Sequence, residues 1–191
     1  MAKVTPSNLV PLLFLFVFAF ASAPAQAAEW KVRDKGEFTF EVSFEGVGTS
    51  GQFTQFDVAL KFDPKQLDSS HLQVSVNLAA ADMGDPEINE IIADPVWFDA
   101  GKFPRAVFKS TRIEARGPDK FVATGVLDLK GKRKEVTVPF SWSEKEKRAD
   151  MRGEFIVQRI AFDVGSGEWA AADPIGIDVK LQFNLSLERG N

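Results

Sequence analysis

The stretch IGIDVKLQFNLSL, residues 175–187, decides the fold. Apolar residues occupy every second position, and polar or small residues stand at most positions between them. A period of two is typical of a β-strand with one face in the core and one face in solvent. At roughly 3.3 Å per residue the stretch would reach about 43 Å, which is long for a compact sandwich and favours an elongated barrel.

The same alternation recurs along the chain, at residues 38–44, 56–62, 72–78 and 136–142. With the less regular segments between them, the chain holds about eight strands. Closure is favoured because an open sheet of this size would leave long edges that invite aggregation. The sequence therefore predicts an all-β fold: an elongated eight-stranded antiparallel barrel with one short helix, which is the smallest closed form that holds a small ligand, as lipocalins do.

Turn signals divide these runs. Gly46, Gly48 and Gly51 are expected to break the first run from the second, and residues 131–133 are expected to form a short hairpin. In the segment 106–115, Phe108 and Ile113 lie on opposite phases, which predicts a β-bulge or a bend.

One stretch has the pattern of a helix. Asp85 is a suitable N-cap, Pro86 suits the first helical position, and Pro95 would stop the helix. The sequence therefore predicts a single short helix between the third and fourth strands.

The N-terminus has the pattern of a secretory signal peptide. Lys3 precedes an apolar run over 9–21, and small residues stand around 25–27. That run is shorter than the roughly 20 residues that a spanning helix needs. We expect a signal peptide at 1–27, cleavage after Ala27, a single domain at 28–191, and a location in the periplasm.

The composition argues against several classes of function. The chain has no Cys or Tyr, one His and a formal net charge of −4, so neither a zinc cluster of neutral ligands nor nucleic-acid binding is expected. Acidic pairs such as Asp82 with Asp85 are typical of loops, where they are solvated or cap neighbouring backbone amides. The basic group at 130–134 is interpreted as a solvated turn, with contact to anionic lipid headgroups as the less favoured alternative. We predict a protein that is not an enzyme, with no metal and no catalytic residue.

The apolar phase of the strands predicts a cavity wall, because large aromatic residues on one face leave little to nest between them. The predicted wall consists of Phe38, Phe40, Val42, Phe44, Phe56, Val58, Leu60, Val74, Val76, Phe108, Val179, Leu181 and Phe183. A cavity for a ligand must open to the outside, and two segments are alternative candidates for this mouth. They are the helix with its following loop and the glycine-bounded segment 165–176. Their candidate residues are Ile88, Ile91, Ile92, Trp97 and Phe98 for the first and Trp169 for the second.

Several motifs in order resemble the YceI family of periplasmic lipid-binding proteins. They are Gly51-Gln52-Phe53, Phe62-Asp63-Pro64, KFPRAVFKST at 102–111, GVLDLKG at 125–131, VTVPF at 136–140 and RIAFDVG at 159–165, and the resemblance extends from Trp30 to Leu187. Many members carry a histidine after the first strand, where this chain has EGVG at 45–48, so no role of that imidazole is carried over.

The resemblance implies a lipocalin-like barrel whose bore holds the tail of a polyisoprenoid or an isoprenoid quinone, with no other cofactor. The segments WFDA at 97–100 and GSGEW at 165–169 look similar to YceI-like domains that are fused to b-type cytochromes. The expected partners are therefore the lipid or quinone, with transient contact to a membrane surface or such a cytochrome, and a homodimer is an open alternative. The alternative function is a periplasmic partner of a membrane redox complex with a filled barrel and no enzymatic activity.

Overall fold

The computed structural model describes residues 27–190, which fold mostly as β-strands. In chain order the strands are β1 (Ala28–Val32), β2 (Glu37–Phe44), β3 (Val47–Phe53), β4 (Phe56–Phe62), β5 (His71–Asn77), β6 (Ala81–Asp82), β7 (Arg105–Ala115), β8 (Lys120–Leu129), β9 (Lys132–Lys145), β10 (Arg148–Gln158) and β11 (Ile175–Arg189). The helical segments are η1 (Leu67–Ser69), η2 (Leu78–Ala80), α1 (Pro86–Ala93), η3 (Arg159–Phe162) and η4 (Gly167–Ala170). None of the helices in this part of the chain is long and apolar enough to cross a membrane.

The sheet closes on itself, which confirms the predicted eight-stranded barrel. The ring runs β1-β4-β5-β7-β8-β9-β10-β11, and antiparallel pairing of β1 with β11 completes it. Strands β2, β3 and β6 continue the sheet on the same side of β11 as β1. The long last strand pairs with β2 over residues 175–184 and with β1 over residues 187–189. The alternating stretch at 175–187 thus forms the wall that both parts of the barrel share.

Two local predictions are confirmed. The register of β7 against β8 shifts between Ser110 and Arg112, where the change of phase predicted a bulge. Helix α1 begins at Pro86, and the Asp85 carboxylate accepts the N–H groups of Glu87 and Ile88 at 2.8 and 3.4 Å. It ends at Ala93, before Pro95.

The break predicted over the early glycines is wrong in extent. Only Glu45 and Gly46 form the turn, with φ of 49° and 81°, values that the tight turn of a β-hairpin needs. Gly48 and Gly51 lie inside β3, where they pair with Ser43 and with Phe40 of β2. Hydrogen bonding to the neighbouring strand outweighs the weak strand preference of glycine here.

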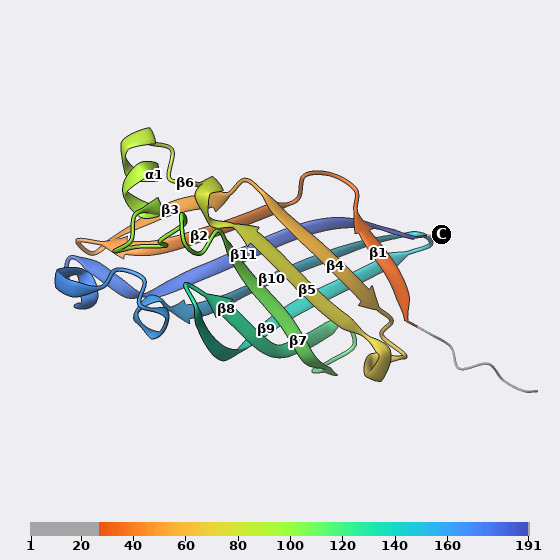
Figure 1. Cartoon of the computed structure of the whole chain (residues 1–191). Coiled ribbons are helices and arrows are strands. Elements are labelled where there is room, and N and C mark those ends of the chain that lie inside the picture. Colours follow the sequence, from red (N-terminus) through yellow and green to blue (C-terminus); the bar gives the residue numbers. More distant parts are fainter. Residues whose placement is uncertain (1–26, 191) are drawn as a thin grey trace, which may run out of the picture.

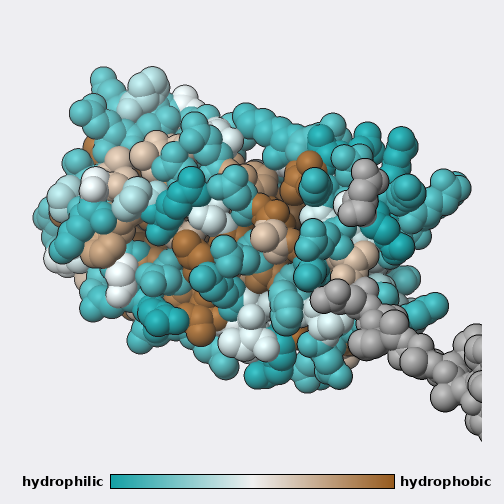
Figure 2. All heavy atoms as spheres, turned by 45° about the vertical axis from the view of Figure 1, so that its right-hand side comes forward, coloured by the Kyte–Doolittle hydropathy of each residue, from teal (hydrophilic) through white to brown (hydrophobic). Residues whose placement is uncertain are grey.

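The elements divide between the two ends of the barrel (Figure 1). Helix α1, the β2–β3 hairpin and the segment between β10 and β11 lie together at one end, and β1 and the C-terminus lie at the other. The outer surface is mainly hydrophilic, with apolar residues showing in the middle of one face (Figure 2).

The end with β1 is packed solid by aromatic side chains. Phe62 is fully buried, and its ring lies 5.0 Å from that of Phe121, 5.5 Å from that of Phe140 and 4.7 Å from that of Trp142. The indole N–H of Trp30 donates to the carbonyl oxygen of Phe62 at 2.9 Å. We call this the closed end. The alternative function expected a barrel filled by its own side chains, and such packing is present at this end of the barrel.

Candidate functional site

The other half of the barrel encloses a cavity of about 510 Å³. Its lining comes from the inward positions of the strands, from α1 and from the segments that follow α1 and β10. Among the lining residues, Thr49 carries the one hydroxyl group and Arg159 the one charge. The cavity therefore offers apolar surface almost throughout, and no acid–base pair for chemistry.

All but one of the predicted wall residues line this cavity. They are Phe38, Phe40, Val42, Phe44, Phe56, Val58, Val74, Val76, Phe108, Val179, Leu181 and Phe183. Leu60 is the exception and corrects the predicted wall, because it is buried in the closed end with Trp30 and Phe62. Its partner across the ladder is Trp30 itself, whose indole fills the space that a cavity would need.

The cavity also has wall residues that the sequence did not single out. They include Phe53, Leu127, Leu129, Val136, Val138, Phe155 and Val157. The alternation at 136–142 already gave the phase of two of them, Val136 and Val138. Phe155 and Val157 repeat the same phase in β10 and could have been found in the same way.

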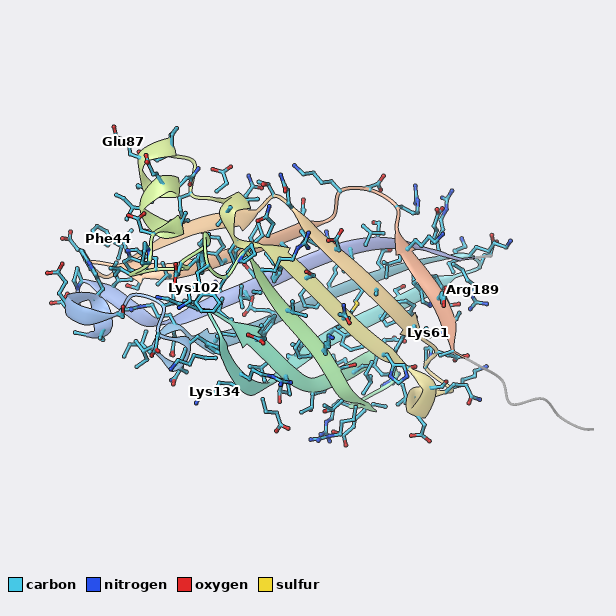
Figure 3. All side chains as sticks on the ribbon, viewed as in Figure 1. Phe44, Lys61, Glu87, Lys102, Lys134 and Arg189 are labelled. Atoms are coloured by element: carbon cyan, nitrogen blue, oxygen red, sulfur yellow. The ribbon has the colours of Figure 1, made fainter. Side chains whose placement is uncertain are left out.

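The two segments that competed for the mouth come together at one place. All of Ile88, Ile91, Ile92, Trp97, Phe98 and Trp169 line the same cavity. The rings of Trp97 and Trp169 pack with their centroids 5.9 Å apart. Ile91 is 52% exposed and Phe44 is 45% exposed. Figure 3 places Phe44 at the end of the molecule that carries Glu87 of α1.

A hydrogen-bonded carboxylate fastens α1 beside this opening. Asp82 accepts hydrogen bonds from the Asn89 amide at 3.0 Å, the Gly84 N–H at 2.9 Å and the Gln52 amide at 3.2 Å. These bonds, that from Asn89 foremost, hold the pKa of Asp82 below its ordinary value of 3.8. The ionised form is therefore favoured in the fold, and the attachment persists at neutral pH and weakens only as the pH falls through that lowered pKa.

Arg159 organises the segment between β10 and β11. The residue is 3% exposed, and all five of its N–H groups donate to backbone carbonyls. The acceptors are the carbonyl oxygens of Val164, Gly165, Ala171, Ile175 and Gly176, at 2.8 to 3.1 Å. The guanidinium also lies 5.9 Å from the ring centroid of Trp97, and burial lowers its pKa. Arg159 thus fixes both the segment and Trp97, a role that the residue's place in RIAFDVG did not disclose.

The basic hairpin between β8 and β9 is fastened to the same region. The Lys130 ammonium donates to the carbonyl oxygens of Val96 and Asp163 at 3.1 and 2.7 Å, and Lys132 pairs with the Asp163 carboxylate at 2.9 Å. Burial of Lys130 lowers the pKa of its ammonium. The interpretation as a solvated turn therefore does not hold for Lys130, which is partly buried and binds two backbone carbonyls. Lys132 remains exposed, and its ion pair with Asp163 lies at the surface.

We expect Arg159→Met to cost about 2 kcal/mol of unfolding free energy, because five carbonyl groups lose their donor and can recover hydrogen bonds only by opening to water. Arg159→Lys should recover part of this, since an ammonium has three donors in place of five. Urea unfolding gives the free energy, and hydrogen exchange locates the loss at 163–176. A cost below about 0.5 kcal/mol, the range of ordinary surface substitutions, would contradict this role.

The described residues hold no group of three or more His, Asp or Glu side chains placed to bind a metal ion. His71 is exposed at the start of β5, where it pairs with Lys61 of β4. What the arrangement can do chemically is shelter an apolar molecule from water.

Comparison with known proteins gives consistent relatives. Residues 30–187 match the family model of the YceI-like domain. A UPF0312 protein of Vibrio parahaemolyticus is 34% identical over 118 residues, which cover 60% of this chain and 62% of the relative. Protein YceI of Salmonella arizonae is 33% identical over 119 residues, 60% of this chain and 61% of the relative. The chain thus spans about three fifths of the length of these curated relatives.

Two solved structures have the same fold. BcnA of Burkholderia cenocepacia superposes with a TM-score of 0.76 at 33% identity, over 80% of this chain and 96% of BcnA. A polyisoprenoid binding domain of Saccharophagus degradans superposes with a TM-score of 0.68 at 12% identity, over 85% of this chain and 99% of that domain. Because the family match covers most of the chain, the protein belongs to the YceI family.

Proposed function

We propose that the protein binds the hydrocarbon tail of an isoprenoid lipid, a polyisoprenoid or an isoprenoid quinone, and carries it through the periplasm. The observation that carries this proposal is the apolar cavity in the half of the barrel opposite the closed end, which we call the open half. Its volume of about 510 Å³ lies within the roughly 300–1,000 Å³ typical of pockets for small ligands.

The energetics favour a carrier over a trap. Burying a tail from water gains about 0.8 kcal/mol per methylene, but a tail in a bilayer is already dry. Transfer from a bilayer into the barrel is therefore nearly neutral in hydrophobic free energy. The protein then serves by shielding the tail between membranes, and the headgroup and the shape of the bore select the lipid.

The relatives support the class of ligand. The Saccharophagus domain that shares the fold is described as polyisoprenoid binding. The similarity of WFDA and GSGEW to domains fused to b-type cytochromes keeps a quinone among the candidate isoprenoid lipids. Contact with such a cytochrome and formation of a homodimer stay predictions.

The location rests on the sequence. The signal peptide expected at 1–27 falls almost entirely outside the described residues, and it supports export to the periplasm. The role is one of binding, since the cavity lining carries no nucleophile paired with a base.

The opening has an apolar rim, formed by Phe44, Val47, Ile88 and Ile91, all of them exposed. Val47 pairs with Phe44 across β2 and β3, so their side chains share one face. We infer that this rim dips into a bilayer while the tail passes between membrane and cavity. Acidic residues flank it in the sequence, at 45, 87 and 90, so a neutral phosphatidylcholine surface is the suitable probe.

We expect Ile91→Ser to slow transfer of a short-chain isoprenoid quinone between phosphatidylcholine vesicles about fivefold, because a half-exposed isoleucine would contribute ~1 kcal/mol on entering the bilayer. Ile156→Ser is the matched control, since Ile156 is 62% exposed on the outer face of β10. Transfer by the wild-type protein itself tests the carrier function. No transfer above the rate without protein would refute it, and equal slowing by both variants would refute the rim.

A further inference from the structure

The barrel wall parts between β1 and β4. These strands pair only from Ala28 to Trp30 against Leu60 to Phe62. Beyond Trp30, β1 follows β11, and the next strand, β2, pairs with β3 and not with β4. Figure 1 shows the chain between β1 and β2 arching away from β4. A gap in the wall is left between residues 31–36 and residues 54–59, which we call the side gap.

A second pocket of about 570 Å³ lies over the side gap, outside the apolar cavity. Two of its lining residues, Phe56 and Val58, also line the cavity. Only one layer of side chains therefore separates the two spaces. The Phe56 ring closes the gap under Gly36, where a Cβ atom would lie 3.1 Å from Phe56 Cζ and 2.9 Å from Leu185 Cδ2. Gly36 has φ of +68° and lets the backbone cross directly over this ring.

The lining of this pocket contrasts with that of the cavity. It carries Lys31, Lys35 and Arg105 against Asp34 and Asp57. Arg105 already pairs with Asp57 at 2.9 Å, which leaves two lysines facing one carboxylate. The pocket thus has an excess of positive charge and of N–H donors, a combination that suits a phosphate group.

In the described part of the chain, the lining of the cavity and its rim offers no cation for a ligand. Arg159, the one charged residue of the cavity lining, spends its five N–H groups on backbone carbonyls. An anionic headgroup would find cationic donors at the side gap, whereas the cavity lining offers only uncharged donors, the Thr49 hydroxyl and the indole N–H groups of Trp97 and Trp169. The cavity and the pocket over the side gap share Phe56 and Val58 as lining residues, so these two side chains mark where the two spaces come nearest.

We propose that the side gap, which the Phe56 ring closes in this structure, opens to admit a lipid tail, and that the pocket over it seats the phosphate headgroup of a prenyl phosphate whose tail fills the cavity. This inference rests on the proposed function, since it needs a tail in the cavity, and it adds the class of headgroup and its position. Phe56 and Val58 then contact the first part of the tail, and Lys31 and Lys35 contact the phosphate.

The test compares farnesyl phosphate with farnesol, which share one tail and differ in the headgroup. Calorimetric titration of the wild-type protein should give tighter binding of farnesyl phosphate. The double variant Lys31→Gln, Lys35→Gln should lose about tenfold in affinity for farnesyl phosphate, because two charge-assisted contacts are removed, and keep its affinity for farnesol. The matched control is Lys145→Gln, Lys147→Gln, which removes the same charge from the exposed hairpin between β9 and β10.

The outcomes are distinct. Equal loss for both ligands, or equal loss in the control, would overturn the headgroup site, because the lysines would then act through stability or overall charge. Wild-type binding of farnesol with no preference for farnesyl phosphate would also overturn it and leave the proposed function standing. Binding of neither ligand would instead refute the proposed function.

The position of the headgroup has its own readout. The chain has no cysteine, so Lys35→Cys and Val47→Cys each offer one site for an environment-sensitive dye, at the side gap and at the rim. Farnesyl phosphate should change the emission at position 35 more than farnesol does, and the two ligands should act alike at position 47. A headgroup effect confined to position 47 would place the phosphate at the rim and overturn the proposal.

Discussion

We expect Val179→Trp to lower the affinity for farnesol about a hundredfold. Val179 lies on the inward face of β11, between Val42 of β2 and Val157 of β10, and all three line the cavity. An indole at this position would project into the bore and displace about four methylenes of a tail. At ~0.8 kcal/mol each this costs about 3 kcal/mol, which corresponds to about two powers of ten in affinity.

The matched control for this variant is Gln182→Trp. Gln182 lies on the same strand but on the outer face, where its amide donates to Glu154 at 2.7 Å. The same substitution there should leave farnesol binding unchanged. Calorimetric titration measures the affinity, and urea unfolding should place both variants within about 1.5 kcal/mol of the wild type, since the cavity has room for the added ring. Undiminished farnesol binding by Val179→Trp would exclude this bore as the tail site.

The largest effect on stability is expected for Phe62→Ala, at about 3–5 kcal/mol. Phe62 has no exposed surface and packs against three aromatic rings and Trp30. Its removal would leave a cavity that these rigid rings cannot fill. A loss of this size is a large part of the stability of an ordinary domain.

Phe56→Ala should cost less, about 1–2 kcal/mol, although Phe56 begins the same strand. Its ring is only half-buried and already borders the cavity, so truncation enlarges a space and does not create one. Urea unfolding of the two variants, with an unchanged dependence on denaturant, measures the difference. Equal costs at the two positions would mean that the open half is packed as solidly as the closed end.

Local chemistry made parts of this fold predictable. The period of two gave the inward phase of β2, β4, β5 and β11, because one strand face must be buried whatever lies opposite. Asp85 and Pro86 gave the start of α1, and the change of phase after Phe108 gave the bulge of β7. These features depend on neighbours in sequence, which a single chain displays.

Features that depend on distant partners were not predictable in the same way. Phe56, Val58 and Leu60 share one phase of one strand, yet the first two face the cavity and Leu60 meets Trp30. The difference lies in which strand pairs with β4 at each level. The contact of Trp97 with Trp169 and that of Arg159 with Trp97 likewise join segments that are far apart in sequence.

The side gap shows the same limit. Residues 33–36 join β1 to β2, and the gap beside them arises because β1 and β2 take different partners on the side away from β11. No residue pattern specifies that Phe56 will close a hole in the wall. The side gap becomes visible only when the pairing of the strands is known.

The most direct measurement is organic extraction and mass spectrometry of the wild-type protein purified from its host, with Val179→Trp prepared in parallel. We expect the wild type to release an isoprenoid lipid in amounts near one per chain, and the variant to release little. Wild-type protein that releases no lipid, and whose tryptophan fluorescence stays constant when a quinone or a polyprenol is added, would contradict the claim that the cavity holds a lipid tail.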